Sequence, residues 1–261
     1  MLRKLASRQT WKIALRGVGI ACIWLLIWQL GSTAVASELL FPSPGATLKS
    51  FLRLVGETGF FLSVSLSLLR VVVGFLGAVV LGVLLGILTA ASPFFNALFR
   101  PFRSVIKATP VASFILLLIL WVKSPVVPAL IAVLTVLPLV WTNVQEGVQA
   151  TDRSLLEMAK LFRFGRGKIL QHIYLPAVLP QLVAACATGL GFAWKASVAA
   201  EVIARTANSI GKNLVESKNY LETADMFAWT AVVIALSILV ERVLRRLLRT
   251  IRSGSRWGDL P

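Results

Sequence analysis

The sequence predicts an all-α membrane protein with about six transmembrane helices, and three properties of the chain support this class. Hydrophobic residues fill 57% of the 261 positions, charged residues only 15%, and the mean hydropathy is +0.82. A soluble domain carries about 25% charged residues, so this chain has too little polar surface to face water. Several uncharged runs reach the roughly 17 to 25 residues that a helix needs to cross a bilayer. These runs do not alternate in polarity, as the strands of a membrane barrel would.

The spans are expected at six places along the chain. Four uncharged runs are long, at residues 17–36, 71–91, 126–144 and 177–200, the last interrupted only by Lys195. Two runs, at residues 108–122 and 226–240, are shorter than usual and need flanking turns to cross. The first run is too long for the apolar part of a signal peptide ending at Ala34-Val35-Ala36, so we expect it to be retained.

No polar linker divides the chain, which predicts one membrane domain over residues 1–261. Its first part, residues 1–61, holds the N-terminal tail, the first span and an outer loop. The core then occupies residues 62–261 and includes a polar loop at 145–176. Small residues spaced by four, such as Gly82 and Gly86 in the second span and Gly189 in the fifth, predict close packing between helices.

Basic residues are concentrated in alternate segments between the predicted spans. The two terminal segments and the segments after the second and fourth spans hold nineteen Lys and Arg against five Asp and Glu, whereas the other segments hold six of each. The positive-inside rule therefore places both termini and the loop 145–176 in the cytoplasm of a multi-pass inner or plasma membrane protein. The net charge of +16 reports this orientation, and we expect no nucleic-acid partner.

Two cations lie within predicted spans, where a charge costs roughly 2.5 to 3.5 kcal/mol to insert. Arg70 lies about 12 Å and Lys195 about 8 Å from the outer ends of their spans, at 1.5 Å per residue. Both are candidates for a substrate path that attracts an anion, together with Glu201 near the outer end of the fifth span. The alternative is that each cation neutralises a protein group, with Glu201 as the partner of Arg70.

The loop 145–176 contains the clearest functional pattern. Asp152 or Ser154 can cap a short helix that has an apolar side at Leu155, Leu156, Ala159 and Phe162 and a basic opposite side. A second helix is expected to follow and to stop before Pro176. An amphipathic helix between two spans either lies on the membrane or docks into a groove of a partner protein.

The residues of this loop resemble the signature of permease subunits of ABC importers, which work with a substrate-binding protein. That signature reads Glu-Ala-Ala, three residues, Gly, nine residues, Ile, one residue, Leu-Pro. Matches occur at Glu157, Ala159, Ile173, Leu175 and Pro176, whereas Met158 replaces an Ala, Arg163 replaces the Gly and Gly165 comes two positions late. Shorter resemblances to the nitrate, sulfonate and taurine type occur at residues 67–75, 108–110, 194–201 and 241–257.

The resemblance implies a type I ABC importer permease fold with a cytoplasmic coupling helix. It implies that cytoplasmic ABC ATPase subunits, carrying ATP and Mg, contact the coupling residues Leu155, Glu157, Met158, Ala159, Phe162, Arg163 and Gly165 and that the loop ends at Ile173, Leu175 and Pro176. We expect Glu157 to organise the loop through hydrogen bonds or an ion pair. Other implied partners are an external substrate-binding protein, a second permease copy and membrane lipids.

The chain itself is not expected to be an enzyme or to bind a cofactor or metal. The run Gly165-Arg166-Gly167-Lys168 does not have the spacing of a phosphate-binding loop. Its one histidine, His172, cannot assemble a metal site alone, and a membrane enzyme would need a clustered set of His, Asp or Cys. The predicted solute is a small anion such as an aliphatic sulfonate, taurine or nitrate. The alternatives are a thiamine-precursor pyrimidine, or a channel or scaffold without ATP coupling.

Overall fold

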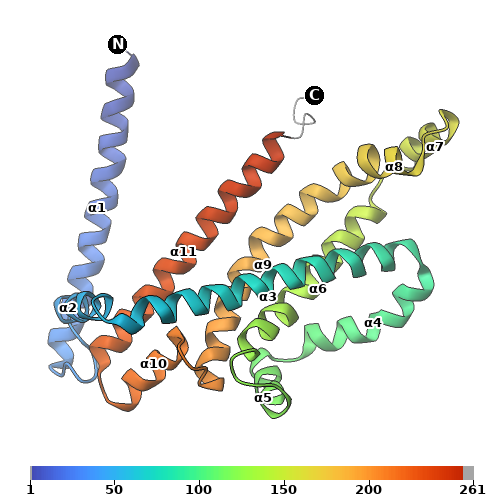
Figure 1. The fold of residues 1–261 in the computed structure, drawn as a ribbon. Helices are drawn as coiled ribbons and strands as arrows, with labels where there is room; N and C mark the ends of the chain where they lie inside the picture. The colour runs from blue at the N-terminus through green and yellow to red at the C-terminus, as the bar shows by residue number, and fades with distance from the viewer. Residues whose placement is uncertain (1, 255–261) are drawn as a thin grey trace. The chain divides into compact units, whose positions relative to one another are not determined.

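The computed structural model describes the backbone of residues 2–254 and the side chains of residues 18–247, and every regular element in that range is a helix (Figure 1). In chain order the helices are α1 (Leu2–Val35), α2 (Pro44–Val55), α3 (Thr58–Ala91), α4 (Pro93–Ala108), α5 (Val111–Trp121), α6 (Val127–Gln149), α7 (Arg153–Leu161), α8 (Arg166–Ile169), the π-helical turn η1 (Leu170–Tyr174), α9 (Leu175–Ala204), α10 (Ile210–Asn219) and α11 (Thr223–Gly254). The predicted all-α class is confirmed.

Five helical segments within the described residues are long and apolar enough to cross a membrane. They are Val18–Val35, Thr58–Ala91, Val127–Gln149, Arg166–Ala204 and Thr223–Leu247. Each contains or overlaps one of the predicted spans, including the short run 226–240, which lies inside the long helix α11. The basic residues at 3–16 and 249–256, on which the predicted orientation partly rests, have side chains outside the described range, as does the end of the resemblance at 241–257.

The predicted third span, at residues 108–122, corresponds to α5, which is too short to cross alone and reaches the length of a span only together with α4. Helix α5 has only 11 residues, about 16 Å at 1.5 Å per residue, against a hydrocarbon core of about 30 Å. It is bent by 105° from α4. The cause is Pro110, because a proline disfavours the helical conformation of the residue before it, and Thr109 is indeed extended, with ψ 128°.

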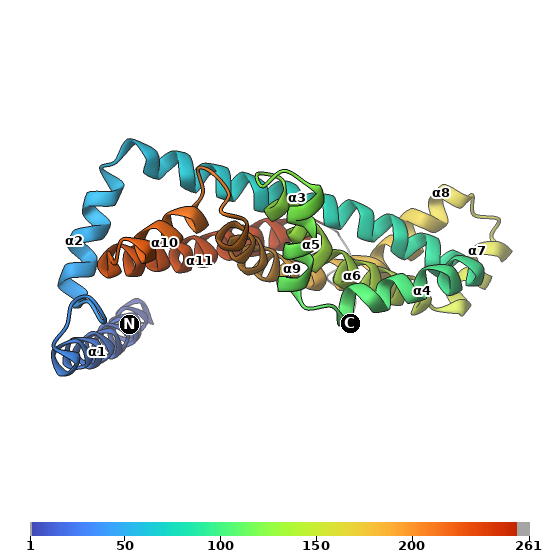
Figure 2. The same ribbon diagram turned by 90° about the horizontal axis from the view of Figure 1, so that it is seen from below.

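Helices α3 and α6 run in the same direction, so the bent pair α4 and α5 between them must bring the chain back across. A Cβ atom added to Gly82 or Gly86 would lie 2.8 Å from Val140 or 2.7 Å from Val144. A Cβ added to Gly74 would meet Ala129, so the contacts follow the same order along α3 and α6. The chain must therefore return from the end of α3 to the start of α6. Both α4 and α5 contact α6 (Figure 2), so together they form one broken span beside it.

The chain divides into two compact units, residues 1–60 with 213–232 and residues 61–212 with 233–261. In the first unit, Phe227 packs on Trp28 and edge-on against Phe41, with ring centroids 6.0 and 5.6 Å apart. Trp28 Nε1 also donates to Pro42 O at 3.0 Å, and Arg53 pairs with Asp225. Aromatic packing thus holds the turn after α1 against the start of α11.

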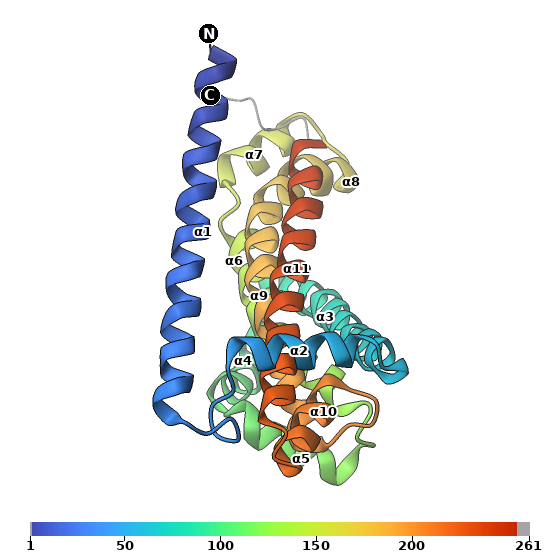
Figure 3. The ribbon, with the colours of Figure 1, turned by 90° about the vertical axis from the view of Figure 1, so that its left-hand side faces the viewer.

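The core of the second unit is the pair α6 and α9, which lie side by side (Figure 3). Ala185, Gly189 and Ala193 are buried on α9, and a Cβ on Gly189 would lie 3.0 Å from Val136 Cγ1. The small residues predicted to allow close helix packing are therefore confirmed on α9, as they are on α3. Helix α5 covers one end of the pair, where Ile115 packs with Val127, Ile131 and Ala200.

Candidate coupling helix and intramembrane charge cluster

Helix α7 is a short, capped helix between α6 and the long segment Arg166–Ala204. The Asp152 carboxylate accepts from the backbone N–H of Ser154 at 2.8 Å, so Asp152 is the cap, and this hydrogen bond lowers the pKa of its carboxyl. The helix ends with Phe164 N–H donating to Ala159 O and Arg163 N–H donating to Lys160 O, at 2.8 and 3.0 Å. These two bonds form a Schellman motif.

In this Schellman motif, the residue that departs from the family signature adopts the conformation expected of the signature glycine. Arg163, which stands where the signature has glycine, has φ 52°, in the left-handed region that glycine adopts without steric cost. The expected turn is therefore made, with arginine in a position that favours glycine. Gly165, two positions later, is the N-cap of α8 with φ −65° and does not replace that glycine.

One side of α7 is apolar and exposed. Leu155, Met158 and Phe162 are 43%, 45% and 67% exposed, with Leu161 beside them at 81%, whereas Ala159 is completely buried on the inner side. We call these four exposed residues the α7 patch. Glu157 is also exposed and forms no hydrogen bond or ion pair within the described part of the chain, so its expected role as an internal organiser of the loop is not seen.

The predicted helix stop before Pro176 is wrong. Helix α8 passes through the π-turn η1 into α9 without a break, and Pro176 follows the π-turn directly, as the second residue of α9. Of the predicted loop-end residues, Ile173 is buried and Leu175 is half exposed. Helices α8, η1 and α9 therefore form one continuous segment from Arg166 to Ala204, with Glu201 near its far end.

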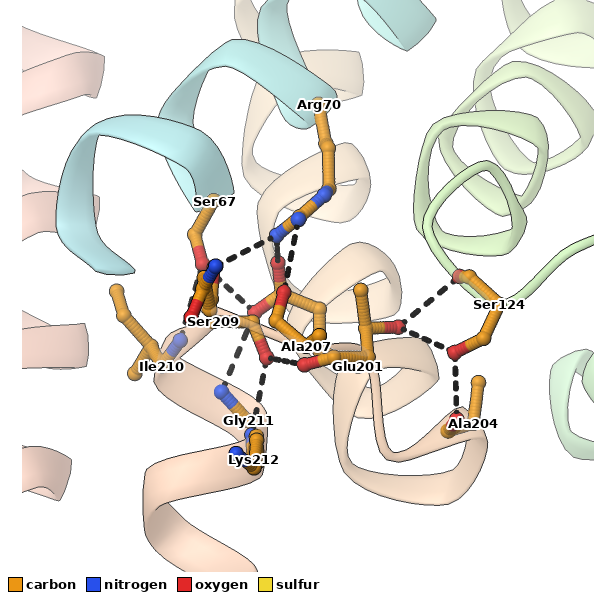
Figure 4. Close-up of polar contacts among 12 residues, drawn as sticks. Ser67, Arg70, Ser124, Glu201, Ala204, Ala207, Ser209, Ile210, Gly211 and Lys212 are labelled. Carbon is orange, nitrogen blue, oxygen red and sulfur yellow. Dashed lines mark hydrogen bonds and ion pairs between the residues drawn. The ribbon is translucent and has the colours of Figure 1, made fainter. Parts of the chain in front are cut away.

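The opposite end of α9 holds a buried charge cluster (Figure 4). Arg70 Nη1 lies 3.1 Å from Glu201 Oε1, with side chains 12% and 1% exposed. Glu201 also accepts from Ser67 Oγ at 2.8 Å and from the backbone N–H of Gly211 at 3.2 Å. The remaining Arg70 donors bind Ala207 O at 3.1 Å and Asn208 O at 3.3 Å. Arg70 is therefore neutralised by Glu201, which was one of the two predicted alternatives.

This cluster also caps the N-terminus of α10. Ser67 Oγ accepts from the backbone N–H of Ile210 at 3.1 Å, and Ser209 Oγ accepts from that of Lys212 at 3.0 Å. Together with the Glu201 contact to Gly211, three side chains satisfy three successive donors. Sequence reasoning missed Ser67, although its position three residues before Arg70 places both on one face of α3.

Lys195 is not part of the cluster. Its side chain is exposed on α9, and it has no hydrogen bond or ion pair within the described residues. Thr188 and Ala199, seven residues before it and four after it, are exposed on the same face. Of the two predicted intramembrane cations, Lys195 alone keeps an unsatisfied charge among the described side chains. No group of three His, Cys, Asp or Glu that could hold a metal occurs in the described residues.

A second polar site, also missed from the sequence, joins α4 to α6. The Arg103 guanidinium donates to Gln145 Oε1 and lies 5.4 Å from the centroid of the Trp141 ring. Trp141 Nε1 in turn donates to Thr89 Oγ1 at 2.8 Å. These contacts hold the α4 part of the broken span against α6.

Comparisons with known proteins agree with this architecture. Residues 78–253 match the model of the family described as "Binding-protein-dependent transport system inner membrane component". The chain is 26% identical over 239 residues to the taurine transport system permease protein of Escherichia coli (strain K12), covering 89% of this chain and 86% of the relative. It is 28% identical over 203 residues to the nitrate import permease protein of Synechocystis sp. (strain ATCC 27184 / PCC 6803 / Kazusa), covering 74% and 72%.

Solved structures share the fold. An inward-facing structure of the MetNI methionine ABC transporter matches with a TM-score of 0.61 at 15% identity, over 72% of this chain and 94% of that chain. An amino acid ABC transporter crystallised with histidines matches with a TM-score of 0.59 at 18% identity, over 78% and 98%. With the family model covering residues 78–253, the chain belongs to the inner membrane components of binding-protein-dependent transport systems, as a permease of the ABC importer type.

Proposed function

We propose that this chain is the translocating subunit of an ATP-driven importer for a small oxyanion or sulfonate. Its relatives include permeases named for taurine, aliphatic sulfonates, bicarbonate and nitrate. All four solutes are small and carry a sulfonate, carbonate or nitrate group. The exposed charge of Lys195 supports an anionic solute, because a cation within a span is costly to insert and such residues mark substrate and ion pathways.

The observation that carries the proposal is the exposed α7 patch. A capped helix that leaves four large apolar side chains exposed in the polar loop between two spans has the form of a helix that docks into a partner's groove. We assign this groove to a cytoplasmic ABC ATPase subunit, which carries ATP and Mg. The continuous helix from Arg166 to Ala204 then transmits the movement of the ATPase subunits across the membrane. Both chain termini lie on the same cytoplasmic side in this arrangement.

The solute path is assigned to the exposed face of α9 that carries Thr188, Lys195 and Ala199. We assign a second permease copy to the opposite side of this path, and an external binding protein that delivers the solute at its outer end. Arg70 is excluded from direct solute contact, because all of its charge is directed to Glu201 and two carbonyl groups.

Uptake by the complete importer in vesicles tests the proposal. Radiolabelled taurine, nitrate and bicarbonate are offered with the ATPase subunits and binding protein present. ATP-dependent uptake of at least one anion is expected, with a KM raised about tenfold or more in Lys195→Met, while the exposed Lys123→Met on the loop before α6 stays unchanged. Uptake without ATPase subunits would indicate a channel, and an unchanged KM in Lys195→Met would remove the lysine from the path.

A further inference from the structure

An apolar groove of about 740 Å³ lies within the second unit, between α3, α6, η1 and α9. Its volume is in the range of sites that hold small molecules. Val83 and Ile87 of α3, Val144 of α6 and Val178 of α9 form its apolar walls. The groove plays no part in the charge cluster and is not on the face of α9 that carries Lys195.

The groove lies at the α7 end of the spans. On α3 it extends from Val83 to Ala91, the last residue of that helix, about 12 Å at 1.5 Å per residue. Ile87, Leu170 and Leu175 line the groove and remain 46%, 61% and 52% exposed, so it is open to the surroundings of the helices. For a chain that spans a membrane, those surroundings are lipid tails of the cytoplasmic leaflet.

A π-helical turn forms the polar end of the groove. Leu170, Gln171 and Tyr174 belong to η1 and line it, and π-turns within α-helices are frequently found at functional sites. Gln171 and Tyr174 bring an amide and a phenol to the end of a cavity that is otherwise apolar. The groove therefore has an apolar body and a polar end, as an amphiphile requires.

The helix that forms this polar end carries only basic charge near the groove. Arg166 and Lys168 are exposed and precede Leu170 and Gln171 by four and three residues, the spacing of neighbours on one helix face. Between residues 158 and 200 the sequence contains no Asp or Glu. A basic site between transmembrane helices on the cytoplasmic side is suited to an anionic lipid headgroup.

We propose that this groove binds an anionic phospholipid, with an acyl chain between α3 and α9 and the phosphate against Arg166 and Lys168. The lipid contacts η1, the segment that connects the coupling helix to the span α9. This site is separate from solute transport, and it stands whether or not the transported solute is an anion.

Photo-cross-linking with lipid analogues tests the site in the full-length protein. The protein is placed in vesicles of equimolar phosphatidylcholine and phosphatidylglycerol, one of which carries a photoreactive diazirine in its acyl chain. Mass spectrometry is expected to find phosphatidylglycerol adducts on residues 83–91 and 170–182, several-fold above phosphatidylcholine adducts. Ala90→Trp, which fills the groove, should reduce these adducts to background. Leu84→Trp, on an exposed position outside the groove lining, should not.

The headgroup contacts are tested without changing the groove. Arg166→Gln and Lys168→Gln should each reduce the phosphatidylglycerol adducts about fivefold, from about 1 kcal/mol per basic residue at a membrane surface, whereas Lys160→Gln on α7 should leave them unchanged. Equal labelling by the two lipids, or adducts that persist in Ala90→Trp, would overturn the proposal. So would cross-links from the groove to a second copy of the chain in place of lipid.

Discussion

Arg70 and Glu201 form a buried ion pair between two membrane-spanning helices, 131 positions apart in sequence, and Glu201 is simultaneously a cap of α10. Removing one partner of a buried pair leaves an uncompensated charge and costs about 3 to 5 kcal/mol, while replacing both is far milder. The pair is therefore expected to hold the loop 205–209 to α3. It fixes the position of this loop more than it raises the free energy of unfolding.

The ion pair predicts strong non-additivity. Arg70→Met and Glu201→Met should each lower the thermal unfolding midpoint clearly, while the variant that carries both changes should lower it less than the sum of the two single changes. Thermal unfolding in lipid nanodiscs measures this. The exposed pair of Arg245 with Glu241 is the control, because the two side chains are 61% and 42% exposed and such pairs contribute about 0 to 1 kcal/mol. Additive losses at Arg70 and Glu201 would contradict the assigned coupling.

Gly211 is expected to tolerate no side chain. A Cβ there would lie 2.4 Å from Glu201 Cβ and 2.6 Å from Val202 N, so Gly211→Ala must displace the backbone at the start of α10. Overpacking of this kind costs about 1 to 3 kcal/mol. Gly59→Ala is the matched control, since nothing lies within 4 Å of its added Cβ. Equal unfolding midpoints for the two variants would show that the α10 cap is loosely packed.

The turn after α7 predicts an unusual preference at position 163. Arg163→Gly should keep ATP-dependent uptake, because φ 52° is free of strain for glycine. Arg163→Val should lose uptake, because a β-branched residue is a genuine outlier at positive φ. ATP-dependent uptake by the complete importer, compared at equal membrane abundance, measures the difference. Full activity of Arg163→Val would mean that the turn does not need its left-handed residue.

The α7 cap predicts a dependence on pH. The pKa of Asp152 is lowered by the N–H of Ser154, so the cap is fully present above the unfolded value of about 3.8 and is lost as the pH falls through the lowered folded value. Hydrogen exchange of residues 153–161 should therefore accelerate in strong acid. Asp152→Asn should remove this acid dependence while keeping the cap, whereas Asp152→Ala should exchange fast at every pH.

The sequence was sufficient for the features that depend on local pattern. Hydropathy located five spans, Gly82 and Gly86 marked the close approach of α3 to α6, and the spacing around Glu157 identified α7 and the family. The hydrogen bond from Ile210 to Ser67 joins residues 143 positions apart, and no local pattern contains that pairing. The position of the break was predictable, since Pro110 disfavours helix at Thr109, whereas no local pattern contains the 105° bend or the contacts of both halves with α6.

The assignment of α7 as the contact with the ATPase predicts uncoupling without loss of the fold. Glu157→Lys should reverse a charge at the surface assigned to the ATPase, and Ala159→Trp should push α7 away from its buried seat, because Ala159 is completely buried. In both variants the rate of ATP hydrolysis by the assembled importer should no longer rise with solute-loaded binding protein, and uptake should fall at least tenfold. Arg153→Gln, at the exposed first residue of α7, is the control and should retain both activities. Membrane abundance and unfolding midpoints should match those of the unaltered protein for Glu157→Lys, which separates lost coupling from lost folding. Normal stimulation and uptake in both variants would place the ATPase contact elsewhere on the cytoplasmic surface.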